Sequence, residues 1–157
     1  MIWDALFAAA NGWALLMWLV LIALPRGPFL QSLVFYGGSG LLCLAYVVLM
    51  VLLLGGLVDP VSTGEGGSAS FYTIAGVRAL FGSDAGVTIG WIHYLALDLF
   101  AGLWIARDAD QKRFSQLAQA PVLLLTFIAG PAGLLLWFLI RERRARALAG
   151  PRKRLKL

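Results

Sequence analysis

Apolar residues form four long runs along the chain, separated by short polar segments. The runs cover roughly residues 2–24, 30–58, 86–106 and 120–140. Each meets the length of about 20 apolar residues that crosses a hydrocarbon core about 30 Å thick. We therefore predict an all-α integral membrane protein, in which four transmembrane helices form a single bundle over residues 1–140.

The polar segments predict how these helices are connected. Two prolines in PRGP (25–28) predict a tight turn, and DPVSTGEGGSAS (59–70) predicts a loop rich in glycine and serine. Residues 71–81 are too few to span the bilayer, but their apolar side chains recur on one face at helical spacing, with Arg78 at its edge. We expect a short interfacial helix there, between the second and third spans.

The composition agrees with insertion into a membrane. The chain has 157 residues, of which 61% are hydrophobic and 13% are charged. A soluble domain of this size has too much surface for its volume to bury so many apolar residues. The first run carries Asp4 where a signal peptide has basic residues, so we expect it to be a transmembrane helix.

Positive charge is concentrated at the end of the chain. Residues 141–157 hold eight of the 13 lysines and arginines and one acid, Glu142. We interpret them as a basic cytoplasmic tail that contacts anionic lipid head groups, in preference to a nucleic-acid-binding segment. Four spans then place the N-terminus in the cytoplasm as well. The connection 107–119 disagrees, because it would put three cations outside: Arg107, Lys112 and Arg113.

Several classes of protein are excluded by what the chain lacks. Cys43 is the only cysteine, so no disulfide framework can form, and His93 is the only histidine. Membrane di-iron hydroxylases and desaturases need clusters of histidines. The sequence also has no P-loop, no HExxH and no GxSxG motif. We expect neither a metal nor a redox cofactor.

An acidic residue, Asp98, lies in the middle of the third run. Trp91 and Trp104 flank it at a separation of about 20 Å along a helix, and tryptophans favour the two membrane interfaces. Asp98 is therefore expected near the bilayer midplane, where a charge costs about 2.5–3.5 kcal/mol or more. It either lines a substrate pocket or is a protonated packing residue that bonds to a neighbouring helix.

Helical geometry places Trp91, Tyr94, Asp98 and Gly102 on one face of this helix. The face offers an aromatic wall, a phenol, a carboxyl group and a small residue that permits close approach. His93 points away from Asp98 and lies nearer to an interface.

The fourth run carries Gly130 and Pro131 at its centre. A proline lacks the backbone N–H and clashes with the carbonyl four residues back, which here belongs to Phe127. That carbonyl would lie at about the depth of Asp98 and could accept a hydrogen bond from a protonated Asp98 or from a ligand. The alternative is an ordinary proline kink in which Thr126 bonds to its own helix. Asn11 is a further polar group near the midplane, and YGGSG (36–40) predicts close helix packing.

Two of these segments resemble a known family. WIHYLALDLFAGLWIARDA (91–109), followed by PVLLLTFIAGPAGLLLW (121–137), is similar to the ABA4-like membrane proteins. Plant members of that family are plastid proteins needed to make neoxanthin from violaxanthin, a reaction that opens a carotenoid epoxide and leaves an allene. The family also has bacterial members. No transit peptide is recognisable, so the resemblance implies a multi-pass protein of the bacterial inner membrane.

The resemblance implies a xanthophyll-modifying protein, and the reaction type suits the residues. Opening an epoxide to an allenic alcohol needs an acid and a base, and a carboxyl group in an apolar site is suited to proton transfer near neutral pH. We expect Asp98 to be the acid and base, with Tyr94 or His93 completing the proton path. The expected substrate-binding residues are Asn11, Trp91, Gly102, Trp104, Phe127, Gly130 and Pro131.

One geometric objection applies to this hypothesis. The end ring of a carotenoid that spans the bilayer lies near an interface, whereas Asp98 lies at mid-depth, so that ring chemistry would fall to His93. Two other classes of function stay open: a non-catalytic carotenoid- or lipid-binding protein or scaffold, and a proton-coupled transporter that would require a homo-oligomer.

Overall fold

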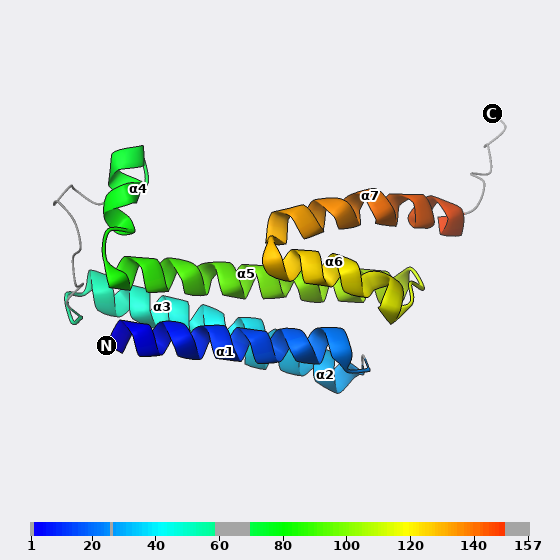
Figure 1. Ribbon diagram of the computed structural model, residues 1–157, viewed down its shortest axis with the longest axis horizontal. Coiled ribbons are helices and arrows are strands. Elements are labelled where there is room, and N and C mark those ends of the chain that lie inside the picture. The colour runs from blue at the N-terminus through cyan, green and yellow to red at the C-terminus, as the bar shows by residue number, and fades with distance from the viewer. Residues whose placement is uncertain (1, 26, 59–69, 150–157) are drawn as a thin grey trace, which may run out of the picture.

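The structure is a computed structural model that describes residues 2–25, 27–58 and 70–149. Within these ranges the chain forms helices connected by short turns (Figure 1), which confirms the all-α prediction. The predicted loop 59–70 lies almost entirely outside the described residues, as does the end of the predicted basic tail.

Three long helical segments lie side by side and form the body of the bundle (Figure 1). They are α1 (Ile2–Ala23), the continuous segment α2 (Pro28–Ser32), η1 (Leu33–Gly40) and α3 (Leu41–Leu54), and α5 (Asp84–Gln111). All three are long and apolar enough to cross a membrane. The first three predicted spans are therefore confirmed as candidate membrane helices.

Local sequence signals explain where several helices begin. Ser83 precedes α5, and its hydroxyl accepts a hydrogen bond from the N–H of Gly86 at 3.0 Å. Ser115 caps α6 (Gln116–Ile128) in the same way, and Thr73 caps α4 (Ile74–Leu80). Each hydroxyl satisfies one of the N–H groups that a helix start leaves without a partner.

The second segment contains a wider turn at the predicted packing patch. Residues Leu33–Gly40 form a π-helix, and a Cβ on Gly38 would lie 2.9 Å from Leu99 Cδ2 and 3.1 Å from Met17 Cγ. Gly38 therefore lets α1, η1 and α5 approach closely. The carbonyl of Gly37 accepts a hydrogen bond from Trp13 Nε1 at 2.7 Å. The packing role expected for YGGSG is confirmed.

The fourth predicted span is not confirmed, because the run 120–140 is broken in the middle. The first helix, α6, ends at Ile128, and the second, α7 (Gly130–Ala149), begins at Gly130. Between them Ala129 adopts φ −148° and ψ 79°, which is not helical. Pro131 has no N–H to continue the α6 hydrogen-bond ladder, and its φ favours the first turn of a new helix.

The two helices form a hairpin that reaches only halfway along α5 (Figure 1). Gln119 Nε2 of α6 donates to the carbonyl of Ile105 at 2.8 Å, Gly130 lies against Asp98, and Arg141 of α7 bonds to Asp108. The hairpin therefore enters from the C-terminal end of α5, turns beside Asp98 and returns. As a result, α7 ends at the opposite end of the bundle from the start of α1.

The short helix α4 lies across the bundle axis, at the end where α5 begins (Figure 1). Its neighbourhood presents exposed apolar side chains, among them Phe71, Ile74 and Val77, and also Arg78. This arrangement fits the short interfacial helix predicted within 71–81. The core of the bundle lies where α1, α5 and the hairpin meet, around Trp18, Leu99, Leu103, Leu123 and Trp137.

Candidate functional site

Asp98 lies at the tip of the hairpin, about halfway along α5. Its carboxyl group packs directly on Gly130, at the point where a Cβ would sit. Only glycine allows this contact. The side chain is half-buried, and within the described residues it makes no hydrogen bond and no ion pair. Asp98 therefore presents an unpartnered carboxyl group beside the first turn of α7.

The face of α5 that carries Asp98 changes character at this residue. Before it, Val87, Trp91 and Tyr94 are exposed, with Tyr94 at 58%; we call these three residues the open face. Beyond it, Gly102 is buried under the ring of Trp18 from α1, and Ile105 is 0% exposed beside Gln119 of α6. Asp98 therefore lies where the covered part of this helix face meets its exposed part.

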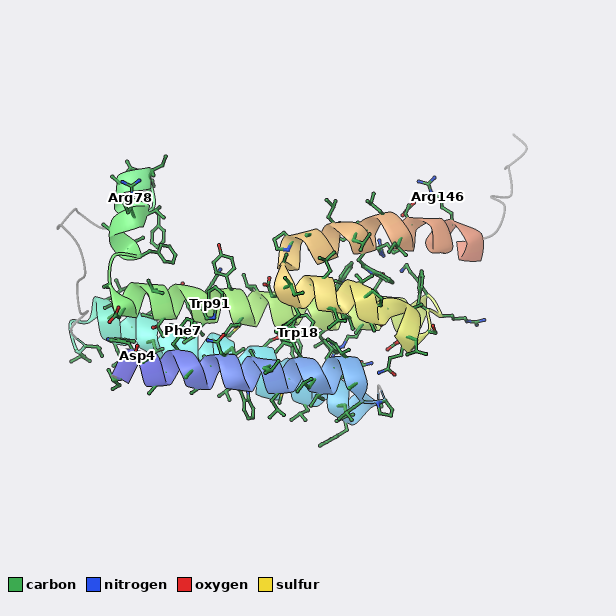
Figure 2. All side chains as sticks on the ribbon, viewed as in Figure 1. Asp4, Phe7, Trp18, Arg78, Trp91 and Arg146 are labelled. Atoms are coloured by element: carbon green, nitrogen blue, oxygen red, sulfur yellow. The ribbon has the colours of Figure 1, made fainter. Side chains whose placement is uncertain are left out.

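Helix α1 forms one side of this site (Figure 2). Trp91 Nε1 donates to Asn11 Oδ1 at 2.9 Å, and the rings of Trp91 and Phe7 are 5.7 Å apart. The amide of Asn11 donates in turn to the carbonyl of Phe7 at 2.7 Å. Asn11 therefore fixes the indole of Trp91, which is a positioning role that helical spacing within one segment cannot reveal.

The inner end of the site is closed by aromatic packing. The ring of Trp18 lies on Gly102, with Cζ3 at 2.7 Å from the position of an added Cβ. The same ring meets Phe127 of α6 edge-on at a centroid distance of 5.6 Å. Gly102 and Phe127 both pack on Trp18 beside the hairpin tip. Their predicted contact with substrate stays a prediction.

The turn at the hairpin tip differs from the predicted kink. Because α6 ends at Ile128, the carbonyl of Phe127 belongs to the last turn of a helix, where carbonyls lack helical partners. No hydrogen bond joins Asp98 to that carbonyl. Thr126 Oγ1 bonds to the carbonyl of Val122 at 2.8 Å, as in the alternative considered from the sequence. Pro131 is exposed at the start of α7.

A second acidic residue, Asp108, fastens the base of the hairpin. It accepts hydrogen bonds from Trp137 Nε1 at 2.9 Å, from Arg141 Nε at 2.8 Å and from Lys112 Nζ at 2.7 Å. The bond to Asp108 raises the pKa of Arg141, which stays charged. Arg141 also lies over the ring of Trp104, 5.6 Å from its centroid. Trp104, which the sequence predicts to bind substrate, therefore packs against this anchor.

His93 faces a different part of the bundle. Its ring lies 5.2 Å from the ring of Tyr46 in α3 and 6.3 Å from that of Tyr94. The structure thus separates His93 from Asp98, as helical spacing indicated, and places Tyr94 between them on the open face. Among the described residues, no three of His, Cys, Asp and Glu gather closely enough to hold a metal ion.

A groove that no motif in the sequence indicates lies at one end of α1 and α5. We call it the surface groove. It has a volume of about 270 Å³ and is lined by Trp3, Asp4, Phe7, Asp84, Val87 and Thr88. Asp84 directly follows the helix cap Ser83. Acidic residues are common in the first turn of a helix, so the sequence alone does not mark Asp84 as part of a groove. Val87 belongs to both the groove and the open face, which makes the two continuous.

Comparison with known proteins gives one match. The model of the family described as ABA4-like, or ABA DEFICIENT 4-like, matches residues 5–137. No curated protein and no solved structure matches the chain. The family match covers the spans, Asp98 and the hairpin tip, and it confirms the resemblance seen in the sequence. The chain therefore belongs to the ABA4-like family of carotenoid-related membrane proteins.

Proposed function

We propose that the protein is a carotenoid-modifying isomerase in which Asp98 exchanges protons with the end group of the substrate. The observation that supports this most strongly is the position of its carboxyl group. It has no partner within the described residues, it lies at mid-depth, and it stands where the open face of α5 ends. Ionisable residues at such positions in membrane helices are functional by default.

The chemistry of epoxide opening can be completed by one carboxyl group. Its acid form donates a proton to the epoxide oxygen as the carbon–oxygen bond breaks. The carboxylate that results then removes the proton from the neighbouring chain carbon, and the electron pair of that bond forms the allene. The acid is regenerated, and the substrate is neither oxidised nor reduced. Tyr94, on the same face, supplies an O–H that can hydrogen-bond to the ring.

Lateral access removes the objection that Asp98 lies too deep for ring chemistry. The hairpin covers only the second half of this face, so an end group can reach Asp98 sideways from the bilayer interior. The rest of a carotenoid about as long as the bilayer is thick then stays in hydrocarbon. Trp91 and Val87 would form an apolar wall beside it.

The experiment is to express the chain in cells that accumulate β-carotene, zeaxanthin or violaxanthin and to separate the pigments by HPLC. We expect a new isomer from violaxanthin and none when Asp98→Asn is expressed at the same level. Asp110→Asn is the matched control, because it makes the same change on the same helix at the exposed end. An unchanged pigment profile with the wild-type chain would refute the isomerase proposal.

A non-catalytic carotenoid-binding protein is the second candidate. It is favoured by the absence of another titratable side chain in contact with Asp98 among the described residues, since His93 faces α3. A binder would co-purify with pigment whose HPLC retention and spectrum after extraction are unchanged. In that case Asp98→Asn would lower the amount of bound pigment without altering its identity.

The charge distribution supports an orientation for the protein in the bacterial inner membrane. Near the base of the hairpin lie Arg107, Lys112, Arg113, Arg141 and Arg146, whereas Arg78 is the described cation at the other end. We propose that the hairpin base is cytoplasmic, where it contacts anionic lipids, and that the N-terminus is outside. This replaces the expectation that both termini are cytoplasmic. Reporter fusions at both ends should show opposite sidedness; equal sidedness would restore four spans.

A further inference from the structure

The surface groove carries polar groups that the reaction at Asp98 does not use. It lies between the first turns of α1 and α5, where Figure 2 shows Asp4 and Phe7 at the end of the bundle away from Arg146. By helical rise, Thr88 lies about 15 Å from Asp98 along α5. A ligand group in the groove is therefore too far from Asp98 to take part in its proton transfer.

Thr88 is the most informative residue of the surface groove. Its side chain is 3% exposed and lines the groove, yet its hydroxyl makes no hydrogen bond with any described residue. Thr126, which is equally buried in a helix, bonds instead to the carbonyl four residues back at 2.8 Å. The Thr88 hydroxyl therefore opens into the groove with its hydrogen-bonding capacity unused by the described residues, where a ligand can reach it.

The other polar groups of the surface groove define which ligand fits. Asp84 contributes a carboxylate that makes no hydrogen bond or ion pair with the described part of the chain, and Asp4 contributes a second carboxyl group to the lining. Carboxylates accept hydrogen bonds and repel anions. Trp3 and Phe7 add aromatic walls, which favour rings and cations. A phosphate or carboxylate is therefore disfavoured, and a hydrogen-bond donor is favoured.

We propose that the surface groove binds the hydrogen-bond-donating end of an amphipathic lipid, with Asp84 and Thr88 as its polar contacts. Two sources share this chemistry: the ammonium of a phospholipid head group and the hydroxyl of a hydroxylated isoprenoid ring. Both reach this level of the membrane naturally, because the groove lies where α1 and α5 meet the surface. The site is independent of the reaction proposed at Asp98.

The test is native mass spectrometry of the purified full-length chain with four probes. Phosphatidylethanolamine is compared with phosphatidylcholine, whose quaternary ammonium has no N–H to donate, and zeaxanthin with β-carotene. In at least one pair, we expect the probe with a hydrogen-bond donor, which is phosphatidylethanolamine or zeaxanthin, to bind more tightly. Thr88→Val should weaken that binding about three- to tenfold, the effect of one hydrogen bond, whereas Thr126→Val, the same change away from the groove, should not.

Asp84→Asn separates the two sources of the ligand. Loss of a carboxylate should weaken binding of the ammonium more than binding of the hydroxyl, which an asparagine carbonyl still accepts. Equal binding within both pairs, or selectivity that survives in Thr88→Val and Asp84→Asn alike, would overturn the proposal. Asp110→Asn, which makes the same change on α5 away from the groove, should keep the selectivity. The phospholipid pair involves no reaction at Asp98, so a failure of the isomerase proposal does not affect its result.

Discussion

Gly133→Ala tests whether the hairpin exists, because the two possible paths of the chain give opposite outcomes. In the structure, Gly133 of α7 packs against Thr126 of α6: an added Cβ would meet Oγ1 and the backbone nitrogen of Thr126 and would lie 2.5 Å from its Cα. Carbon atoms in contact are about 3.5–4.0 Å apart, so the helices would have to separate by about 1–1.5 Å. In one continuous helix, residues 126 and 133 would be two turns apart and could not clash.

The magnitude follows from a matched comparison. Overpacking against a rigid neighbour costs about 1–3 kcal/mol, whereas replacing glycine by alanine inside a helix gains up to about 1 kcal/mol. Gly12→Ala in α1 isolates the second effect, because nothing lies within 4 Å of its added Cβ. We therefore expect Gly133→Ala to be about 1–3 kcal/mol less stable than Gly12→Ala.

The assay is equilibrium unfolding of both variants in mixed micelles with increasing SDS, followed by circular dichroism. A second measurement on the same samples is pigment retention, which should fall in Gly133→Ala because separating the helices moves Gly130 away from Asp98. If Gly133→Ala is as stable as Gly12→Ala, the close contact is absent and the chain continues through Pro131 as a fourth span.

Three further predictions concern contacts around the site. Asp108→Asn should lower the free energy of unfolding by about 1.5–3 kcal/mol, since it weakens charged hydrogen bonds at the hairpin base. Glu142→Gln, which breaks an exposed ion pair with Arg146, should lower it much less in the same assay. Gly102→Ala should displace the ring of Trp18 and shift its fluorescence, and an unchanged spectrum would contradict the packing. Asn11→Leu removes the acceptor of a tryptophan N–H and should destabilise the protein by about 1 kcal/mol, measurable by the same unfolding curves.

The parts of the fold that follow from local patterns could be predicted from the sequence. Long apolar runs indicate the first three membrane helices, and the position of Asp98 between two tryptophans indicates its depth. Helical spacing also places Trp91 and Asp98 on one face and His93 on another. Each of these inferences depends only on the geometry of a single helix, which the sequence determines directly.

The partners of these residues could not be predicted in the same way. Asn11 and Trp91 are distant in sequence, and their hydrogen bond depends on α1 and α5 running in the same direction in register. Nothing in the spacing of α5 distinguishes Thr88 from other helix residues. It lines the surface groove because Trp3 and Phe7 of α1 lie opposite it. Contacts between helices arise from packing along their whole length, and no spacing rule within one helix contains that information.

The break at Gly130 and Pro131 is a case in which hydropathy cannot decide between two structures. A kinked span and a hairpin have the same apolar content, and both need a proline near the centre. What favours the hairpin is the contact of Gly133 with Thr126 at the tip and the bonds of Asp108 to α7 at the base. Both contacts require the chain to reverse between α6 and α7. The average hydropathy of the run is the same whether or not it reverses.

The cations of the connection 107–119 do indicate that the chain reverses after α6, because their predicted position does not fit four spans. With four spans, Arg107, Lys112 and Arg113 would lie outside, opposite the basic end of the chain. With a hairpin, the α5–α6 connection and the end of α7 lie at the same end of the bundle, so these cations join Arg141 and Arg146 on one side. A cationic loop on the wrong side of a predicted topology, followed by a run with a central Gly-Pro, therefore favours a helix that returns over one that crosses.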